Sequence, residues 1–495
     1  MRNNISQVGL GLLAGLALCG LAMGYWVIVQ GSSLLSRGDN GRRLTEGERG
    51  RGAILARGGE VLARTTLRDG IPVREYPLVS AAHVIGIHSP RLGNTGLEDR
   101  YDELLRGARG DVIQQLRQRF LSAPLHGADV VTTIDSRVQQ AAADAMGESR
   151  GAVVALDPRS GEILALLSRP GFDPNTLEQS WELMRADQSA PLLNRAIQAT
   201  YPPGSTFKVI TAAAALDLGI IDPEVEFRCT TSAQIDALSV DCRNHAHLPV
   251  VNYRQAFAWS CNRTFALTGL FLPLGAPLNS RLDDRAVAAR PWSTIDVEAA
   301  GEQLMGYARA FGFERTPTFD LPVTLSRVKG DGRWYPSLLA QTGFGQGEVT
   351  ATPLEMALVA ATIANDGVVP VPYLAERARL QNGADRPLKP ILASALSAVQ
   401  QRAIRPSTAT DLRRFMVESV EYAYAQQAKI PGITVAGKTG TAETGLGEVP
   451  HAWFIGFAPA DHPRVAVAVI MEHRGSGAEV ATPAARRVMA AALQS

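Results

Sequence analysis

A serine and a lysine spaced three residues apart are the first candidates for chemistry in this chain of 495 residues. Ser205 and Lys208 follow two prolines and a glycine at 202–204 and precede an alanine-rich apolar run at 209–218. This pattern predicts a helix that begins near Ser205, with both side chains on one face of its first turn. A serine is a poor nucleophile unless a neighbouring neutral amine can take its proton. The pair therefore predicts a nucleophile beside its general base, with free helix-start amides favouring an oxyanion.

Two downstream motifs decide between this interpretation and a capping serine beside an exposed lysine. Ser260 and Asn262 lie two residues apart on a predicted loop, where a hydroxyl could relay a proton and an amide could hold a substrate carbonyl. The segment Gly-Lys-Thr-Gly-Thr at 437–441 lies in a predicted strand, and its lysine and hydroxyls suit a substrate carboxylate. Alone, these motifs also fit a surface turn and an edge strand with a protective lysine. Their order along the chain favours one site.

Length and charge limit the class of protein. A chain of this length predicts two or three folding units. The 49 Lys and Arg nearly balance the 48 Asp and Glu, so no charge pattern indicates nucleic acid.

An apolar run near the amino terminus predicts a membrane anchor. Residues 8–29 carry no charge, and this run is long enough to cross a bilayer as a helix. We expect a cytoplasmic tail at 1–7 and an uncleaved helix at 8–30 that crosses the cell (inner or plasma) membrane once. The rest of the chain is expected on the extracytoplasmic side. Five arginines between 37 and 51 count against this orientation, but long translocated domains escape the charge rule.

The remaining chain divides near residue 128. Residues 31–128 are predicted as a linker and a small pedestal of dimerisation type, beginning with a hairpin around the glycines at 58–59. Residues 129–495 are predicted as an α+β domain whose sheet is completed by both of its ends. Its strands are expected at 129–134, 151–156, 162–167, 433–441, 452–457 and 465–471, and its helices include 137–146, capped by Asp135 or Ser136, and one from 482 to 493.

In this order, the three motifs resemble the signature of penicillin-binding proteins and class A β-lactamases. The chain is similar to class B penicillin-binding proteins, monofunctional peptidoglycan D,D-transpeptidases, and especially to their shorter actinobacterial-type members. The resemblance includes further segments at 51–54, 96–98, 343–347, 352–354, 364–367 and 451–459. It implies a penicillin-recognising, β-lactamase-like α+β domain with an antiparallel sheet and helices.

The resemblance also implies catalytic roles. Ser205 would attack the penultimate D-Ala carbonyl of a stem peptide, Lys208 would take its proton, and the terminal D-Ala would leave. Ser260, with Lys208, would pass the proton to the leaving amine, and Asn262 would position the substrate amide. An amine of a second stem peptide would then resolve the acyl-enzyme.

Substrate binding is implied for the strand motif. Lys438 and Thr439 would shape the field of the site, Thr439 and Thr441 would hold the terminal carboxylate, and Gly440 would lie between them. Backbone N–H groups of Ser205 and Thr441 would form the oxyanion hole.

The implied ligands are peptidoglycan stem peptides on lipid-linked glycan strands, and β-lactams, which would acylate the serine. No cofactor or metal is implied, since His245 and His247 lie too close in sequence to indicate a metal site alone. The expected partner is a membrane-embedded glycan polymerase of the shape, elongation, division or sporulation type.

Three alternatives remain. A D,D-carboxypeptidase would use water as acceptor, and a β-lactamase or β-lactam sensor would share the fold. A hydrolase needs a second base, and no glutamate followed three or four residues later by asparagine lies between Asn262 and Lys438. A catalytically silent scaffold would not require these competent residues.

The cysteines carry a smaller prediction. Cys229 and Cys242 are close enough in sequence to close a small disulfide loop in an oxidising compartment, although free thiols fit equally well. Cys19 and Cys261 are expected to be packing residues.

Overall fold

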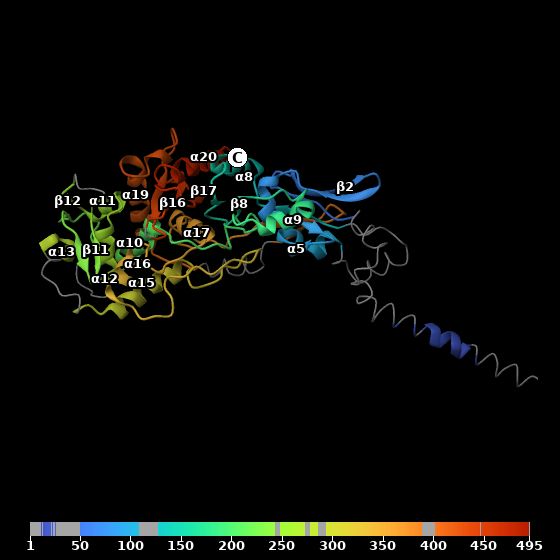
Figure 1. Cartoon of the computed structure of the whole chain (residues 1–495), viewed down its shortest axis with the longest axis horizontal. Helices are drawn as coiled ribbons and strands as arrows, with labels where there is room; N and C mark the ends of the chain where they lie inside the picture. The colour runs from blue at the N-terminus through green and yellow to red at the C-terminus, as the bar shows by residue number, and fades with distance from the viewer. Residues whose placement is uncertain are drawn as a thin grey trace, which may run out of the picture.

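Two large sheets organise the chain in the computed structural model (Figure 1). The structure describes residues 11, 13–20, 22, 25, 50–107, 127–242, 248–272, 278–285, 294–388, 401–445 and 447–494.

The larger domain is built on a five-stranded sheet in the order β15-β16-β17-β7-β8, antiparallel throughout. Its strands are β7 (Gly151–Leu156), β8 (Ile163–Arg169), β15 (Ala436–Ala442), β16 (His451–Ala458) and β17 (Val465–Met471). Two strands come from the start of the domain and three from its end. The predicted α+β domain, with a sheet completed by both ends, is therefore confirmed.

Helices cover both faces of this sheet, which explains why its strands are buried almost throughout. On one face lie α8 (Ser136–Met146) and α20 (Ala481–Leu493), and on the other lies α17 (Pro353–Ala364). Successive side chains on a strand point to opposite faces. Accordingly, Val153 packs in the α8–α20 core, whereas Val154 packs in the core that contains α17.

A cluster of further helices packs beside β15. The cluster is built from η2 (Gly204–Phe207), α10 (Lys208–Asp217), α11 (Tyr253–Ala258), α12 (Asn262–Phe271), α13 (Asn279–Leu282), α15 (Val297–Phe311), α16 (Pro336–Gly343) and α19 (Pro406–Tyr422). Helix α10 packs against α12, α15 and α19, while η2 and α19 pack against β15. The predicted nucleophile helix is thereby placed between the helical cluster and the sheet.

A six-stranded sheet forms the pedestal, in the order β14-β13-β6-β1-β2-β3. Its strands are β1 (Ile54–Leu55), β2 (Val61–Arg68), β3 (Ile71–Glu75), β6 (Asp129–Thr132), β13 (Ala375–Arg379) and β14 (Asp385–Pro387). The predicted hairpin around 58–59 is present as the antiparallel β1–β2 pair. Strand β6 runs parallel to β1 and antiparallel to β13, so segments from both sides of residue 128 complete this sheet.

Buried charges hold the pedestal together. The Arg51 guanidinium lies 2.6 Å from the Glu98 carboxylate, which also accepts a 2.7 Å hydrogen bond from Arg74 Nε. Asp102 accepts a further 2.7 Å bond from Arg51. Removing one member of such a buried group leaves an uncompensated charge, which is strongly destabilising. The network links the first residues of the pedestal to α5 (Gly96–Arg100) and α6 (Asp102–Leu105).

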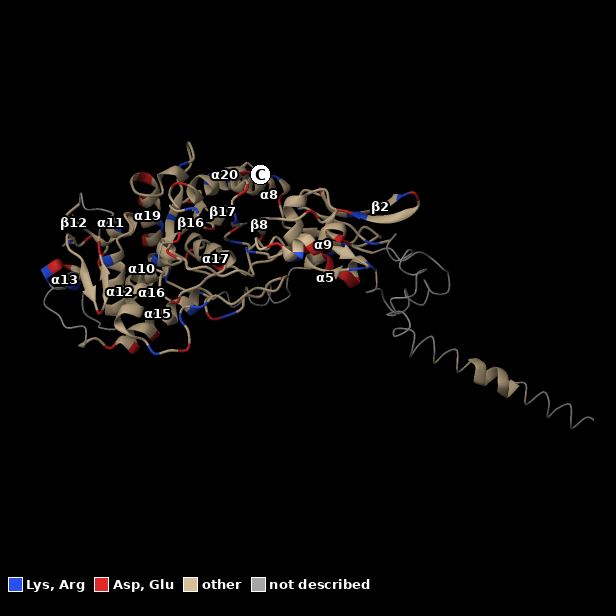
Figure 2. Cartoon of the chain, in the orientation of Figure 1, with Lys and Arg blue, Asp and Glu red and all other residues tan. Residues whose placement is uncertain are grey.

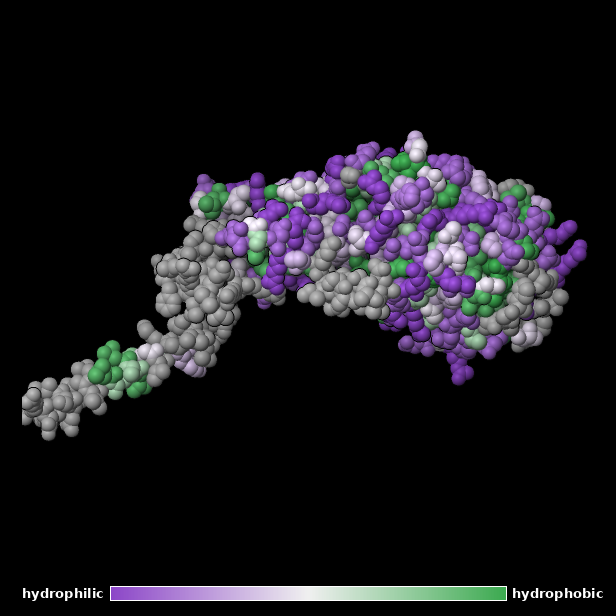
Figure 3. Space-filling model, turned by 180° about the vertical axis from the view of Figure 1, so that it is seen from behind, coloured by the Kyte–Doolittle hydropathy of each residue, from purple (hydrophilic) through white to green (hydrophobic). Residues whose placement is uncertain are grey.

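Acidic and basic residues are interspersed along the ribbon of the pedestal and of the larger domain (Figure 2), and hydrophilic residues dominate the reverse face (Figure 3). The described residues therefore do not gather into a region of one charge sign. Within the described residues, no helix is both long enough and apolar enough to cross a membrane. Most of the predicted anchor at 8–30 lies outside these residues.

Candidate active site

Pro203 and Gly204 start the nucleophile helix as a tight 3-10 turn. Gly204 has φ +54°, and a Cβ there would lie 2.8 Å from the Thr441 carbonyl oxygen. Its N–H donates to the Gly345 carbonyl over 2.9 Å. Glycine is therefore required both by the backbone conformation and by the close approach of β15. This approach sets the half-buried Ser205 beside the Gly-Lys-Thr-Gly-Thr strand.

Tyr201 fixes the segment that leads into Ser205. Its backbone exchanges two hydrogen bonds with Ala351, of 2.9 and 2.8 Å. Its hydroxyl donates to Glu472 Oε1 over 2.8 Å. The next carbonyl, that of Pro202, accepts a 3.0 Å bond from the Trp453 indole. The nucleophile segment is thus tied to β16 through Trp453 and to the residue after β17 through Glu472.

Glu472 joins this segment to two arginines. Arg195 is fully buried and donates from Nε to Glu472 Oε1 over 2.8 Å, and Arg150 lies 3.0 Å from Oε2. Burial alone would raise the pKa of Glu472, but the Tyr201 hydrogen bond and the two arginines outweigh it and lower that pKa. The carboxylate is therefore ionised at neutral pH, and its stabilisation is lost as the pH falls through the folded-state pKa.

We expect Glu472→Ala to lower the free energy of unfolding by about 3 kcal/mol, because it leaves the buried Arg195 cation without its partner. Chemical denaturation at neutral pH measures this loss. The matched control is Glu182→Ala, which removes the exposed ion pair with Arg185 and should change stability by less than about 1 kcal/mol. Equal effects of the two substitutions would contradict a structural role for the Glu472 cluster.

Lys208 is surrounded by oxygens of its own motif and of the Ser260–Asn262 motif. Its Nζ lies 3.0 Å from Ser205 Oγ, 2.7 Å from the Ser260 carbonyl, 3.1 Å from Ser260 Oγ and 2.6 Å from Asn262 Oδ1. The carbonyl and amide oxygens can only accept. A neutral amine would give its two N–H groups to these acceptors and direct its lone pair toward a hydroxyl. This is the arrangement that a general base for Ser205 requires.

Lys438 approaches Ser260 from the sheet. Its Nζ lies 2.9 Å from Ser260 Oγ, so this hydroxyl stands between two buried amines. The amine also donates to the Thr439 carbonyl over 3.1 Å. Ser260 has φ +58°, an uncommon conformation for a residue with a side chain. The turn that carries it ends at Asn262, the first residue of α12.

Burial sets the charge of the two lysines. It lowers the pKa of Lys208 well below its ordinary value, and the neighbouring Lys438 charge lowers that pKa further. Burial also lowers the pKa of Lys438 to about 7. The Phe265 and Phe257 rings lie 5.6 and 5.8 Å from the respective amines, and within the described ranges neither lysine has a carboxylate partner. Burial and the neighbouring Lys438 charge therefore both favour the neutral form of Lys208, the form that can act as a base.

The rest of the strand motif lines the approach to Ser205. Thr439 is buried, whereas Thr441 is exposed. A Cβ on Gly440 would meet the Pro203 carbonyl oxygen and Trp453 Cβ, each at 3.0 Å, which explains the glycine between the threonines. Thr441 pairs with Ala452 of β16.

The structure thus brings together Ser205, Lys208, Ser260, Asn262 and Lys438, with the strand at 439–441 beside them. The sequence did not indicate Glu472, whose only signal is its position directly after a predicted strand. It was also wrong about Cys261. This residue is not a mere packing residue, because its sulfur and that of Cys229 both lie at bonding distance from Cys242.

A serine beside a neutral lysine, where a helical cluster meets an antiparallel sheet, defines a serine acyltransferase of the penicillin-recognising class. Family models agree: residues 151–490 match the penicillin binding protein transpeptidase domain and residues 51–130 the penicillin binding protein A dimerisation domain. The chain therefore belongs to the penicillin-binding protein transpeptidases.

Similar proteins come from mycobacteria. The peptidoglycan D,D-transpeptidase PbpA of Mycolicibacterium smegmatis is 37% identical over 481 residues, which cover 91% of this chain and 90% of that one. A ceftriaxone acyl-enzyme complex of penicillin-binding protein A from M. tuberculosis matches with a TM-score of 0.77 and 35% identity, over 91% of this chain and 100% of that one. An imipenem acyl-enzyme complex of the same protein matches with a TM-score of 0.76 and 36% identity, over 91% and 99% of the two chains.

Proposed function

We propose that the peptidoglycan D,D-transpeptidase reaction of this chain proceeds through an acyl-enzyme on Ser205. The observation that carries this assignment is the 3.0 Å distance from Ser205 Oγ to the Lys208 amine, whose pKa burial lowers. Lys208 takes the hydroxyl proton as Ser205 attacks the carbonyl carbon of the penultimate D-Ala. The carbonyl π electrons move onto the oxygen, and the collapse of the tetrahedral intermediate expels the terminal D-Ala.

Ser260 supports the return of this proton. Its hydroxyl lies within hydrogen-bond distance of both amines, so it can pass a proton from Lys208 to the leaving nitrogen, with Lys438 fixing its orientation. Asn262 holds Lys208 through Oδ1 over 2.6 Å, and its amide nitrogen remains available for a substrate carbonyl. The tripeptide Ser260–Asn262 would therefore both relay the proton and hold the lysine that takes it.

The strand at 438–441 binds the substrate. Hydroxyls of Thr439 and Thr441 would hold the terminal carboxylate, with Gly440 allowing close approach of the peptide. The N–H groups of Ser205 and Thr441 would donate to the oxyanion. This proposal is supported by the packing of Gly204 directly against the Thr441 backbone.

The acceptor distinguishes transpeptidation from D,D-carboxypeptidation. Incubating the full-length protein with a D-Ala-D-Ala donor peptide and an amine acceptor should give released D-Ala and a cross-linked peptide in equal amounts. Release of D-Ala with hydrolysed donor alone would instead establish a carboxypeptidase.

β-Lactams should form long-lived adducts on Ser205, as the acyl-enzyme complexes of the M. tuberculosis relative suggest.

The two lysines predict a bell-shaped pH profile for acylation by penicillin. Below the pKa of Lys208 its ammonium cannot take the Ser205 proton, so the second-order rate constant rises with pH. Above about pH 7 Lys438 loses its charge and attracts the substrate carboxylate less, so the rate constant falls. The apparent values belong to the coupled pair. Stopped-flow acylation between about pH 5 and pH 9 measures both limbs, and a single limb near the ordinary lysine pKa would contradict this assignment.

The division of labour along the chain completes the proposal. Residues 8–30 would anchor the protein in the cell membrane. Residues 31–128 would form the linker and the pedestal, to whose sheet β6, β13 and β14 are added, and residues 129–495 would act on the extracytoplasmic side. The partner would be a membrane-embedded glycan polymerase that supplies strands for cross-linking. The apolar run at 8–29 supports the anchor, and the match at 51–130 to a dimerisation domain supports an interaction role for the pedestal.

A further inference from the structure

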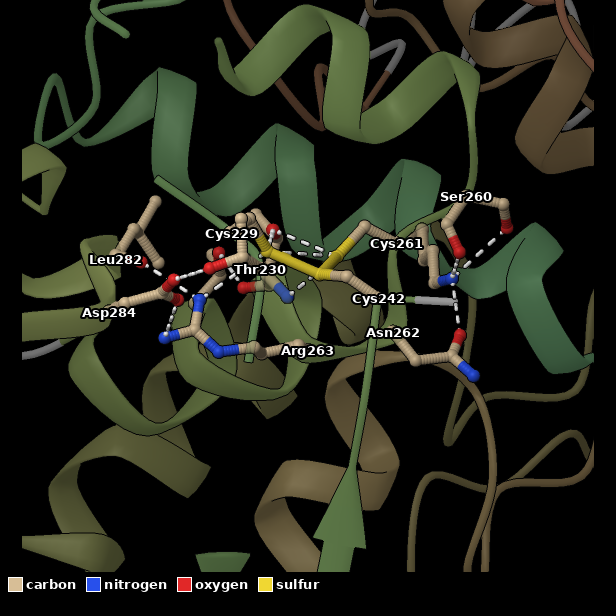
Figure 4. The surroundings of a disulfide bond; sticks show 12 residues. Cys229, Thr230, Cys242, Ser260, Cys261, Asn262, Arg263, Leu282 and Asp284 are labelled. Atoms are coloured by element: carbon tan, nitrogen blue, oxygen red, sulfur yellow. Dashed lines mark hydrogen bonds and ion pairs between the residues drawn. A yellow bond between two sulfur atoms is a disulfide. The ribbon is translucent and has the colours of Figure 1, made fainter. Parts of the chain in front are cut away.

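Three buried cysteines adjoin the Ser260–Asn262 turn (Figure 4). Cys229 follows β9 (Phe227–Arg228), Cys242 lies just beyond β11 (Leu238–Val240), and Cys261 is the central residue of the turn itself. Their sulfur atoms all lie within 4.8 Å of one another. A set of three thiols cannot be fully paired, so at most one disulfide forms within it.

Cys242 is placed to pair with either of the other two. Its Cα lies 6.6 Å from that of Cys229 and 5.1 Å from that of Cys261, and both distances fall within the range of protein disulfides. The sulfur atoms of Cys229 and Cys261 lie 3.6 Å apart. Whichever pair forms, the remaining thiol stays in contact with the disulfide.

Both outer sulfurs lie beside hydrogen-bond donors, and the Thr264 hydroxyl is near both of them. Arg263 Nη1 lies 3.4 Å from Cys229 Sγ and is held there by a 3.0 Å bond to the Leu282 carbonyl. Cys261 Sγ accepts from Thr264 N over 3.4 Å and from Thr264 Oγ1 over 3.2 Å. Donors of this kind stabilise a thiolate, which is the attacking and the leaving form in disulfide exchange.

We propose that this cluster is a thiol–disulfide exchange site in which Cys242 alternates between Cys261 and Cys229. The Cys229 thiolate attacks Cys242 Sγ, the 229–242 bond forms, and the 242–261 bond breaks with its electron pair leaving on Cys261. The proton lost by Cys229 is balanced by the proton gained by Cys261. No oxidant is consumed, because both states contain one disulfide and one thiol.

The exchange acts directly on the active site. With the 242–261 bond, the tripeptide that holds Lys208 is tied covalently to the segment after β11. With the 229–242 bond, this covalent tie is absent, and Cys261 Sγ keeps only its hydrogen bonds to Thr264 at the start of α12. The strained backbone of Ser260, at φ +58°, lies one residue away. This consequence rests on the proposed roles of Ser260 and Asn262.

Peptide mapping tests the exchange without reference to activity. Full-length protein carrying Cys19→Ser is prepared without reductant, held near neutral pH, quenched with acid and alkylated. Trypsin then releases residues 229–243, which contain two of the cysteines, and residues 255–263, which contain the third. A 229–242 bond gives a looped first peptide and an alkylated second one, whereas a 242–261 bond joins the two peptides and leaves the alkyl group on Cys229.

Both patterns are expected in one preparation, in a ratio that returns to the same value at neutral pH after partial reduction and reoxidation have displaced it. A single pattern under all conditions would overturn the proposal. So would three free thiols, with or without a bound metal ion such as zinc.

Two variants test the effect on the active site. Cys229→Ser permits only the 242–261 bond, and Cys261→Ser permits only the 229–242 bond. Their rate constants for acylation by a penicillin should differ by about threefold or more, because small displacements at a site strongly change rates. Acylation of the protein with all three cysteines should show two kinetic phases. Their amplitudes should match the fractions of the 229–242 and 242–261 forms found by peptide mapping. Equal, single-phase rates in all three proteins would contradict any influence on the site, while acylation failing in all three would count against the Ser205 assignment alone.

Discussion

Replacing Ser205 with alanine is expected to abolish acylation, with a loss of at least about 10⁴-fold in the rate constant for penicillin. The hydroxyls of Ser260 and Thr206 are not expected to take its place, because Ser260 Oγ is engaged by both lysines and Thr206 Oγ1 donates to the Pro203 carbonyl over 2.7 Å. Labelling by a fluorescent penicillin and release of D-Ala from a donor peptide should both disappear.

The variant should remain folded. The Ser205 hydroxyl contacts Lys208 at the half-buried start of a helix, so its removal should change stability by about 1 kcal/mol or less. Thermal unfolding monitors this, and Ser180→Ala on α9 (Leu177–Ala186) is the matched control with full activity expected. Residual stoichiometric labelling of folded Ser205→Ala would place the nucleophile elsewhere.

Replacing Lys208 with methionine is expected to lower the acylation rate by about 10³- to 10⁴-fold, because the variant lacks the base that takes the Ser205 proton. Lys208→Arg should fare no better, since a guanidinium stays protonated and cannot act as a base. Neither variant should recover at high pH, in contrast to an enzyme that merely needs a positive charge at this position. Stopped-flow acylation across the pH range measures the effect.

A matched control is available on the surface. Lys429 is exposed and pairs with Glu421, so Lys429→Met should leave acylation unchanged. If Lys208→Met retained acylation within about tenfold of the control, Lys208 would be a positioning residue, and the base would have to be sought elsewhere.

Local signals explain what the sequence could predict. Asp135 caps α8 by accepting from the N–H groups of Arg137 and Val138, and the signal lies within four residues. The β7–β8 hairpin and the start of the Ser205 helix depend on equally local turn and proline signals. The three motifs could be combined into one candidate site because their order resembles that of penicillin-binding proteins, in which they lie together.

Contacts between distant segments could not be predicted in this way. Strand β6 begins at the predicted domain boundary, yet it pairs with β1 of the pedestal and with β13 from far downstream. The partner of a strand depends on tertiary packing rather than on its own alternation. Glu472 and Cys261 were missed for the same reason, since each gains its importance from residues remote in sequence.

The depressed pKa values of the lysines belong with these non-local properties. Nothing around Lys208 in the sequence specifies that Phe265 and Lys438 will surround its amine. The motif predicted the residue type, whereas the packing of α10, α12 and β15 sets the protonation state on which the mechanism depends.

The most direct measurement is the intact mass of the full-length protein after exposure to benzylpenicillin, followed over hours and combined with peptide mapping. The account predicts one adduct with the mass of the whole antibiotic, confined to the tryptic peptide 196–208 that contains Ser205, and slow to disappear. An adduct on another peptide would contradict the assignment of the nucleophile, and unmodified protein with accumulating hydrolysed penicillin would contradict the conclusion that this chain is a transpeptidase rather than a hydrolase.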